Sequence, residues 1–478
     1  MKKTGLFKII MFVLLVAVIA SWIFQPSYFD EGSLQKIADM NNVGLFDYFS
    51  LMIKSFSFDY FIQIILLLFS IGALYGVLEK TGKYRAWIDR IVKKLKGREF
   101  LFLVITSFVI TLLTSIFDYG FALFIFFPLL ISILLAMGYD KVTVIAATFG
   151  AVLVGTIGST IGYNTSGVIS EIVSLKVADG FYFKLALLLI SYVALLLFLS
   201  RAKRTKVTEK DLEATDRYIG EKKANKYSIA PIITIFCVLF VLLVLGCTNW
   251  EGTFNVQVFN KVHEAIMGFS PKLPYLHLTL DGFEYGTEKI AIFSKLFGDI
   301  TALGTWFYSE MAVMCVFASL LLSWIYKVKL FEAMKDGAKK MLKPAAMVLF
   351  VYTVIYFAGN QMFYPTIAKA LLGITNKFSV IISSISMALA SFFHVDILYV
   401  SNYAIPQLAA KADDPVVVSL LSQSIYGVSM FIMPTSALLV FGLEYLHLPY
   451  KEWVKKTWKL FLVLLAIVLV VLLIARYV

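Results

Sequence analysis

The stretch 155-GTIGSTIGYNTSG-167 lies in the middle of an apolar span, residues 142–176, that is too long for one membrane crossing. Its glycines permit a helix to break, and its hydroxyl and amide groups provide hydrogen-bond donors and acceptors. Irregular backbone at membrane depth is tolerated only where it is buried in protein or lines a cavity. The stretch therefore predicts a broken helix at a candidate binding site, with close helix packing through small residues as the alternative.

A second interruption lies in the span 416–447, where residues 433–436 read MPTS. Pro434 removes a backbone donor and favours a break, and two hydroxyl residues follow it. Two broken helices that face each other would present half-helix N-termini to an anionic group, while freed carbonyls could hold a cation. The two interruptions together predict one polar pocket, and packing through small residues is again the alternative.

The composition requires a lipid environment. Of the 478 residues, 60% are hydrophobic and only 15% are charged, and the mean hydropathy is +0.84. A crossing helix needs roughly 20 mainly apolar residues. Segments of this kind occupy residues 7–24, 59–79, 99–137, 142–176, 181–200, 230–248, 302–326, 345–360, 378–410, 416–447 and 457–476. The chain is thus expected to be a multi-pass protein of the cytoplasmic membrane.

The net charge of +12 follows the membrane orientation and does not indicate a nucleic-acid partner. With the N-terminus placed in the cytoplasm as the start of an uncleaved first helix, the loops 80–98, 201–226, 327–343 and 451–459 fall inside and are basic. The long stretch 249–300, on the other side, is acidic or balanced. This alternation is the positive-inside bias of membrane proteins.

Self-comparison predicts an internal repeat. The residue types match at an offset of 278, followed by a change of register to 275, and chance agreement among apolar spans is the alternative. The matched pairs are Gly82 with Asn360, Phe100 with Phe378, Asp118 with Asp396, Pro128 with Pro406, Thr160 with Thr435, Gly167 with Gly442, Lys184 with Lys459 and Arg201 with Arg476. One crossing, 230–248, separates the copies, so the second copy is expected to be inverted.

This reading predicts four parts. They are a first membrane half, 1–201, with its repeat core at about 59–201; a cytoplasmic linker, 202–229; connecting helices, 230–344, with the extracytoplasmic loop 249–300; and a second, inverted half, 345–478. The spans 99–137 and 378–410 are expected to be hairpins, either re-entrant or fully spanning.

The tips of these hairpins carry acids. Asp118 interrupts the first hairpin and Asp396 the second. An ionised carboxylate at membrane depth costs a few kcal/mol or more, so it usually faces a cavity, a partner or a transported ion. We predict that both acids couple transport to a cation or proton, with hydration at the membrane interface as the alternative. His394 could carry a proton beside Asp396, or could be a packing residue.

Other polar residues complete the predicted substrate site. Asn164 and Thr165 belong to the first broken segment, Ser401 and Asn402 follow the second tip, and Asn360 ends the span 345–360, where a capping turn is an equal alternative. No catalytic residue, metal site or cofactor is expected, apart from Na+ or H+ as a coupling ion. The three cysteines lack metal-ligand spacing, and no P-loop is present.

Several motifs resemble the YfcC-like group of the C4-dicarboxylate anaerobic carrier family, within the ion transporter superfamily. They are 433-MPTSALLV-440, 448-LPYKEW-453, 127-FPLL-130, 138-GYD-140 and 158-GST-160. The likeness covers about residues 40–200 and 345–478. It implies an elevator-like carrier of small charged metabolites, cation-coupled or exchanging, and a homodimer. By motif match, it also implies substrate binding at Gly158, Ser159, Thr160, Pro434, Thr435 and Ser436.

This sequence departs from the family pattern at both tips. Gly120-Phe121-Ala122 stands where relatives have an acidic pair, and residues 394–399, with Asp396, replace a Ser/Gly-rich tip. A dicarboxylate would need a cationic anchor, and no Lys or Arg is expected in the core. Two aspartates would instead suit Na+, protons or a cationic substrate. Some relatives are described as arginine/ornithine exchangers, so a basic amino acid antiporter is the alternative to a dicarboxylate carrier.

The sequence thus predicts an all-α polytopic membrane protein with two inverted-topology repeats, re-entrant hairpins and broken helices. The predicted function is secondary active transport of a small charged metabolite, either C4-dicarboxylate-like or an amino acid. A channel would show ring-like polar periodicity, which is not evident. An intramembrane aspartyl protease would also need two membrane aspartates, but the Gly-x-Gly-Asp context is missing.

Overall fold

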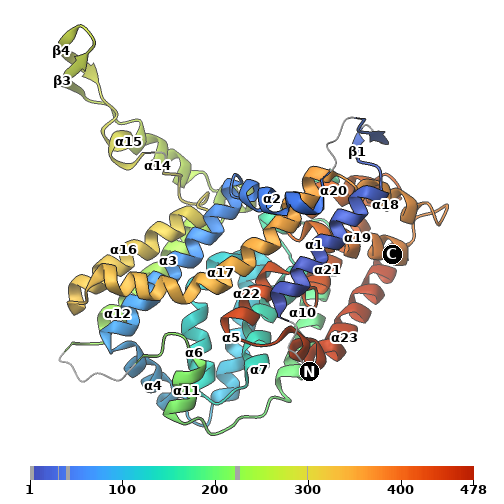
Figure 1. The fold of residues 1–478 in the computed structure, drawn as a ribbon, viewed down its shortest axis with the longest axis horizontal. Coiled ribbons are helices and arrows are strands. Elements are labelled where there is room, and N and C mark those ends of the chain that lie inside the picture. The colour runs from blue at the N-terminus through green and yellow to red at the C-terminus, as the bar shows by residue number, and fades with distance from the viewer. Residues whose placement is uncertain (1–4, 31, 39–42, 221–226, 299, 478) are drawn as a thin grey trace.

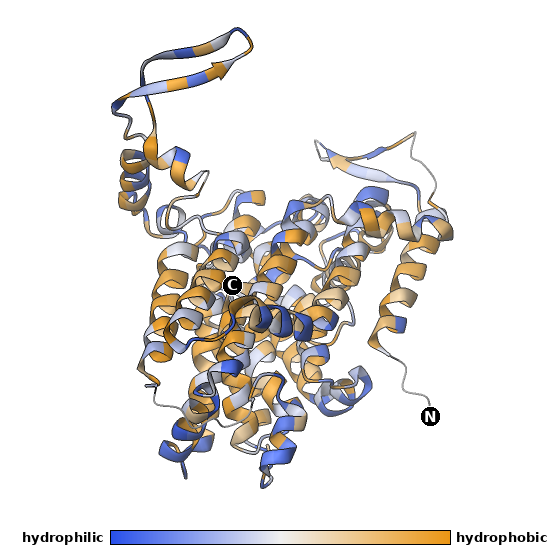
Figure 2. Cartoon of the chain, turned by 60° about the vertical axis from the view of Figure 1, so that its left-hand side comes forward, coloured by the Kyte–Doolittle hydropathy of each residue, from blue (hydrophilic) through white to orange (hydrophobic). Residues whose placement is uncertain are grey.

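The computed structural model describes residues 5–30, 32–38, 43–220, 227–298 and 300–477, and most of them are helical (Figure 1). Within these residues, eight helices are long and apolar enough to cross a membrane. They are α1 (Leu6–Ile23), α3 (Asp59–Thr81), α5 (Glu99–Phe117), α10 (Phe181–Leu199), α12 (Ala230–Cys247), α16 (Tyr308–Tyr326), α17 (Leu330–Gln361) and α23 (Tyr450–Tyr477). Figure 2 shows hydrophobic residues along these helices. The prediction of a helical, multi-pass membrane protein is confirmed.

Shorter elements connect the spanning helices. The helices among them are α2 (Tyr48–Ser55), α4 (Tyr84–Lys94), α6 (Phe127–Ala136), α7 (Lys141–Ile145), α8 (Ala151–Ile157), α9 (Val168–Ile172), α11 (Glu209–Thr215), α13 (Trp250–Phe254), α14 (Val258–Met267), α15 (Ile292–Phe297), α18 (Tyr364–Leu372), α19 (Val380–His394), α20 (Ile397–Ala409), α21 (Pro415–Met430) and α22 (Ala437–Tyr445). Single turns of tighter or wider helix are η1 (Leu45–Asp47), η2 (Gly120–Ile125), η3 (Ala146–Gly150) and η4 (Tyr163–Gly167).

Two antiparallel β-hairpins extend beyond the helical body. β1 (Ser27–Asp30) pairs with β2 (Ser33–Lys36), and β3 (Lys272–Thr279) pairs with β4 (Gly282–Lys289). The second hairpin stands on α14 and α15 and projects away from the membrane helices (Figure 1). Residues 250–297 are called the arm below. The face that carries both hairpins is called the arm face.

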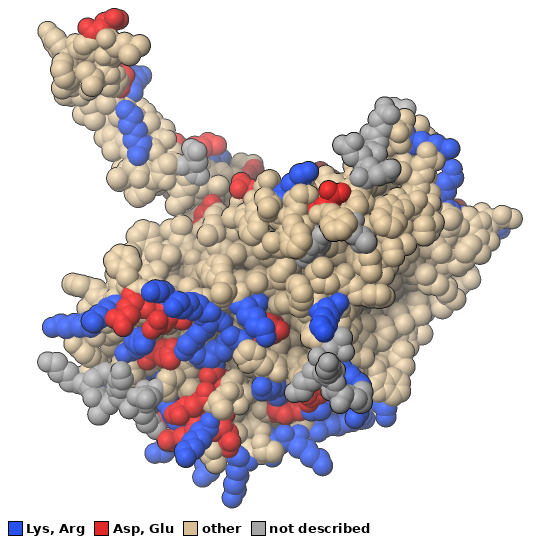
Figure 3. Space-filling view, viewed as in Figure 1, with Lys and Arg blue, Asp and Glu red and all other residues tan. Residues whose placement is uncertain are grey.

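The opposite face carries α4, α11 and the connection that follows α10, and it is called the linker face. Lys and Arg side chains gather there in the lower part of Figure 3, around α4, α11 and the start of α17. Ion pairs hold this face together, among them Lys340 with Glu79 at 2.5 Å and Arg85 with Glu213 at 2.5 Å. The basic stretches of the sequence thus meet on one side of the molecule.

The same order of elements occurs twice. In the first unit, α3, α4, α5, α6, α8, α9 and α10 follow one another; in the second, α17, α18, α19, α20, α21, α22 and α23 do. The helices that begin the units run antiparallel, because Phe61 of α3 stacks on Tyr352 of α17 at 4.5 Å while Lys80, at the far end of α3, pairs with Asp336 at 3.3 Å. Each unit contains a helix that is interrupted, at residues 158–162 and 431–436.

The boundary predicted at 344/345 falls inside the continuous helix α17. The basic stretch predicted as the loop 327–343 is helical from Leu330 onward. Its charges do not oppose a helix, because these turns extend past the membrane on the linker face. There they pair with residues such as Glu79 and Glu444.

Glycine brings α3 and α17 into backbone contact. A Cβ atom added at Gly337 would overlap the carbonyl oxygen of Gly72 and lie 2.6 Å from the Cα atom of Gly76. Small residues permit this closeness, and in lipid such packing is the main source of helix association. The crossing fixes how the first helices of the two units meet.

We therefore expect Gly337→Val to destabilise the protein by about 3 kcal/mol or more, because backbone on the facing helix cannot move aside as a side chain can. The melting temperature in detergent measures this effect. Leu342→Ala, at a side chain that is 59% exposed on the same helix, is the control and should leave the melting temperature unchanged. Equal melting temperatures for Gly337→Val and the unsubstituted protein would contradict the assigned contact.

Candidate functional site

The first acidic tip is a turn between two helices. α5 ends at Phe117, and Asp118 caps it in the left-handed conformation with φ of 53°. Asp and Asn tolerate this conformation better than most residues. The Asp118 carboxylate then accepts a hydrogen bond of 2.8 Å from the backbone N–H of Thr165. Thr165 lies in η4, beyond the break, so the tip is joined to the second limb of the first broken helix.

Gly162 lies directly against this carboxylate. A methyl group at Gly162 would overlap both carboxylate oxygens and the carboxyl carbon of Asp118. The backbone of Gly162, with φ of −58° and ψ of 124°, is open to any residue. Glycine is therefore needed here for space and not for backbone freedom.

The second tip has the reverse arrangement. α19 ends at His394, and Asp396 caps the start of α20, accepting a hydrogen bond of 3.0 Å from the N–H of Leu398. Its other oxygen accepts a hydrogen bond of 2.7 Å from the hydroxyl of Tyr60, which belongs to α3. The sequence pairs Asp118 with Asp396, and the structure places the first at a helix C-terminus and the second at a helix N-terminus.

Both aspartates line one cavity of about 100 Å³. Its wall comes from both tips, both broken helices and the helices α3 and α16. The lining residues are Tyr60, Thr114, Asp118, Gly120, Phe121, Val152, Thr156, Asn164, Thr165, Phe307, Tyr308, Asp396, Ile397, Leu398, Tyr426 and Leu438. Two carboxylates thus share an aromatic cavity whose described lining contains no Lys or Arg.

Asn164 and Thr165 are therefore placed in the cavity, as the sequence predicted. The break itself is held differently. The Ser115 hydroxyl donates to the Gly158 carbonyl at 2.7 Å, and the N–H of Thr160 donates to the Ser115 carbonyl at 2.9 Å. Gln423 of α21 donates to the carbonyl of Ser159 at 3.0 Å. Ser115 and Gln423 thus satisfy backbone groups of residues 158–160, which do not line the cavity, while the Ser159 hydroxyl is buried and has no hydrogen-bond partner among the described residues. Substrate binding by Gly158, Ser159 and Thr160 stays a prediction.

The mate of this break is also buried. Ser436 caps α22 by accepting from the N–H of Leu439 at 3.4 Å, and Thr435 is completely buried. Pro434 precedes them in the interruption between α21 and α22. The cavity lining reaches this break through Leu438, one turn into α22. Substrate binding by Pro434, Thr435 and Ser436 stays a prediction.

Four other predicted residues lie outside the cavity lining. The His394 ring is buried and stacks on Tyr403 with the ring centroids 4.4 Å apart. Asn360 and Asn402 are exposed and donate to carbonyls of their own helices, at 2.6 Å and 2.9 Å. Ser401 is buried in α20. Their predicted roles in coupling and substrate binding stay untested.

Sequence reasoning missed the tyrosines of the cavity. Tyr60 opens α3, Tyr308 opens α16, and Tyr426 lies in α21, where its hydroxyl donates to the Val395 carbonyl at 2.9 Å. Each lies in or at the start of an apolar span, where sequence alone does not distinguish a tyrosine that lines a cavity from one that packs. Tyr60 and Tyr308 also lie outside the hairpins and breaks, where no polar pattern marks them.

One lysine, Lys184, is buried among the membrane helices outside the cavity lining. This side chain is completely buried at the start of α10. Its ammonium donates to the Ser166 hydroxyl at 2.5 Å and to the Val177 carbonyl at 2.8 Å. A lysine stem can be buried where the charged end reaches such acceptors. Lys184 supports the second limb of the broken helix, but it does not line the cavity.

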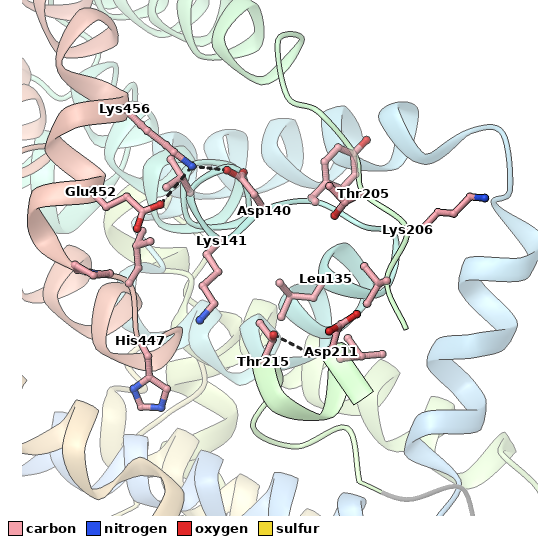
Figure 4. Close-up of a pocket in the computed structure, with 16 residues that line it drawn as sticks. Leu135, Asp140, Lys141, Thr205, Lys206, Asp211, Thr215, His447, Glu452 and Lys456 are labelled. Carbon is pink, nitrogen blue, oxygen red and sulfur yellow. Dashed lines mark hydrogen bonds and ion pairs between the residues drawn. The ribbon is translucent and has the colours of Figure 1, made fainter. Parts of the chain in front are cut away.

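A larger cavity, of about 510 Å³, lies on the linker face (Figure 4). Most of its charged groups described here pair with other groups of the protein. Lys456 contacts Asp140 at 2.9 Å and Glu452 at 3.4 Å, and Lys141 donates to the Leu446 carbonyl at 2.6 Å. Neither tip aspartate lines this cavity. We therefore assign it to the packing between the linker and the two units and not to the candidate binding site.

An acidic cavity lined by helix turns and broken helices from both parts of a multi-pass protein is the architecture of a membrane carrier. Comparison with known proteins agrees. The family described as "C4-dicarboxylate anaerobic carrier" (DcuC) matches residues 4–477, and the chain belongs to this family. Membership of a carrier family excludes the intramembrane protease.

Individual relatives are distant. A protein of Haemophilus influenzae (strain ATCC 51907 / DSM 11121 / KW20 / Rd), named "Uncharacterized protein", is 26% identical over 200 residues, which are 39% of each chain. The Escherichia coli (strain K12) protein "Putative basic amino acid antiporter YfcC" is 22% identical over 412 residues, 82% of this chain and 73% of that one. The crystal structure of the Alcanivorax borkumensis YdaH transporter gives a TM-score of 0.41 at 13% identity, covering 98% of both chains.

Proposed function

We propose that this chain is a secondary active transporter of small cationic metabolites, a basic amino acid antiporter being the best fit. Asp118 and Asp396 hold the positive charges of the substrate, or a proton or Na+ in its place. The observation that carries the proposal is the shared cavity, in which two carboxylates meet and the described lining offers no Lys or Arg.

The charge balance of the cavity favours this substrate class over a C4-dicarboxylate. A dicarboxylate would bring two negative charges beside two aspartates, and like charges in a poorly solvated site repel strongly. A guanidinium or ammonium group would instead form charge-assisted hydrogen bonds with a carboxylate. The aromatic rings of Tyr60, Tyr308 and Phe121 offer further stabilisation of a cation through their faces. The name of the E. coli relative points to the same class.

The proposed mechanism is an elevator-like movement of the tips and broken helices against α3, α16 and α17. The cavity lies between these two groups of elements, since Tyr60 and Tyr308 face the tips across it. The Tyr60–Asp396 hydrogen bond crosses that boundary and would have to break during transport. α19 and α20 have 15 and 13 residues, fewer than the roughly 20 of a full crossing, which supports a re-entrant second hairpin. In the first hairpin α6 has 10 residues, whereas α5 has 19 and is long enough to cross. The antiparallel α3 and α17 support an inverted repeat.

The orientation follows from the basic linker face. Placed in the cytoplasm by the positive-inside bias, this face puts the start of α1 inside and the arm outside the cytoplasmic membrane. From the family likeness we further propose that transport is coupled to Na+ or H+ or proceeds by exchange, and that the protein is a homodimer.

A thermal-shift screen of purified protein tests the substrate class. Arginine, ornithine and lysine are expected to raise the melting temperature, because a ligand that binds only the folded state stabilises it by about 2.7 kcal/mol at 100 times its Kd. Succinate and fumarate, with and without Na+, should leave it unchanged. Stabilisation by the dicarboxylates and not by the basic amino acids would refute a cationic substrate.

A further inference from the structure

A groove of about 290 Å³ runs between α10 and α23, the last helices of the two units. On the α10 side it is lined at helical spacing by Ile190, Val193, Ala194, Leu197 and Phe198, and by Arg201 just beyond the helix. On α23 it is lined by Lys459, Leu460, Val463 and Ile467. Ala194 and Leu460 are buried and form the floor, whereas Val193, Leu197 and Val463 are about half exposed and form the walls. The groove is thus an apolar channel on the outer surface of the membrane helices.

Two cations stand at one end of the groove. Arg201 follows the end of α10 and leads into the linker, while Lys459 lies one turn beyond Lys456, which pairs with Asp140 on the linker face. Both are exposed, and neither forms an ion pair with another of the described residues. The Lys459 ammonium lies 5.7 Å from the centroid of the Trp458 ring, and tryptophans at span ends lie at headgroup depth. The charged end of the groove is therefore at the membrane surface.

We propose that this groove binds one anionic phospholipid. Arg201 and Lys459 hold the headgroup phosphate, and an acyl chain lies along Val193, Leu197 and Val463. A basic site between membrane helices at the linker face suits an anionic headgroup. Unlike a flat basic surface, the groove can bind the acyl chain and the phosphate of one lipid at the same time, because its apolar length leads to the two cations. Such a lipid would contact the last helix of each unit at once.

The test is competition between two lipids that differ only in the headgroup. Purified protein is equilibrated with equal amounts of dioleoyl phosphatidylglycerol and dioleoyl phosphatidylcholine, and native mass spectrometry gives the ratio bound. Each Lys or Arg near an anionic surface contributes about 1 kcal/mol of binding free energy. Two cations therefore predict that phosphatidylglycerol is preferred by roughly 30-fold. The double variant Arg201→Gln/Lys459→Gln should bring the ratio close to equality.

The matched control is Lys335→Gln/Lys339→Gln, which removes two exposed cations from the same face at the start of α17. It should keep the preference, and both double variants should keep the melting temperature. An unchanged preference in Arg201→Gln/Lys459→Gln, or an equal loss in the control, would overturn the proposal.

Two further measurements exclude other occupants. Inorganic phosphate should not displace the bound phosphatidylglycerol; displacement would show a headgroup site without a chain-binding groove. Val193→Cys and Val463→Cys should not form disulfides between two copies of the chain in membranes. A cross-link would place a second copy over the groove and overturn the lipid assignment.

Discussion

In proteoliposomes, Asp396→Asn is expected to lower the rate of arginine or ornithine exchange by about 100-fold, because a charge-assisted contact worth roughly 3 kcal/mol is lost. Asparagine keeps one oxygen, which can still accept from the N–H of Leu398, and its NH2 group can donate to the Tyr60 hydroxyl in place of the oxygen that now accepts from it, so the second tip should retain its conformation. Asp118→Asn is expected to have a similar effect, since its carboxylate faces the same cavity. The measurement is uptake of labelled amino acid into vesicles loaded with the exchange partner.

Asp413→Asn is the matched control. Asp413 is an exposed acid in the connection between α20 and α21, and it lines none of the cavities described above. This variant should transport at the normal rate. If Asp396→Asn and Asp118→Asn both transport normally while remaining folded, the two aspartates do not belong to the transport site.

Gly162→Ala is expected to lower transport by about tenfold to 100-fold while the protein stays folded, with a loss of stability no larger than that of one hydrogen bond to a charged group, about 1.5–3 kcal/mol. The backbone at Gly162 accepts alanine, but the added methyl group overlaps the Asp118 carboxylate and must push it away from the N–H of Thr165. A displaced carboxylate loses a charge-assisted hydrogen bond of about 1.5–3 kcal/mol and no longer points toward the substrate. Exchange rate and melting temperature, measured together, separate this effect from unfolding.

Gly359→Ala is the control for a glycine substitution. A Cβ atom there would lie 3.5 Å from the Tyr403 hydroxyl, an ordinary contact, and the residue is helical.

A double-mutant cycle adds a second check. If Gly162→Ala acts through the carboxylate, it should add little to Asp118→Ala, which removes the carboxylate. Independent, additive losses would show that Gly162 acts by another route.

The order of segments was predictable because membrane helices are local. A run of roughly 20 apolar residues has one stable solution in lipid, a helix that satisfies its own backbone. The interruption at residues 158–162 was visible in the local sequence, since a cluster of glycine and hydroxyl residues permits a break inside an apolar span. Matched residue types at a fixed offset then related Asp118 to Asp396. All of these inferences use residues adjacent in sequence or a repeat within it.

Tertiary packing decided which of the predicted polar residues line the cavity. The backbone N–H of Thr165 donates to the Asp118 carboxylate, whereas the backbone carbonyls of Gly158 and Ser159 accept from Ser115 and Gln423, which belong to two other helices. Those pairings join residues 43 to 264 positions apart, and no local pattern encodes them. Tyr60 is similar, since its partner Asp396 is 336 residues away. Whether a hydroxyl binds substrate or a neighbouring carbonyl therefore depends on which helix packs beside it.

By itself, the sequence determined that the chain spans a membrane and indicated where its helices break, and it predicted from the repeat that two acids occupy matching tips. Only the tertiary structure brought those two acids to one cavity and closed it with Tyr60 and Tyr308. The physical reason is that helix formation and partition into lipid depend on each segment alone, whereas a binding site forms only where segments distant in sequence come into contact.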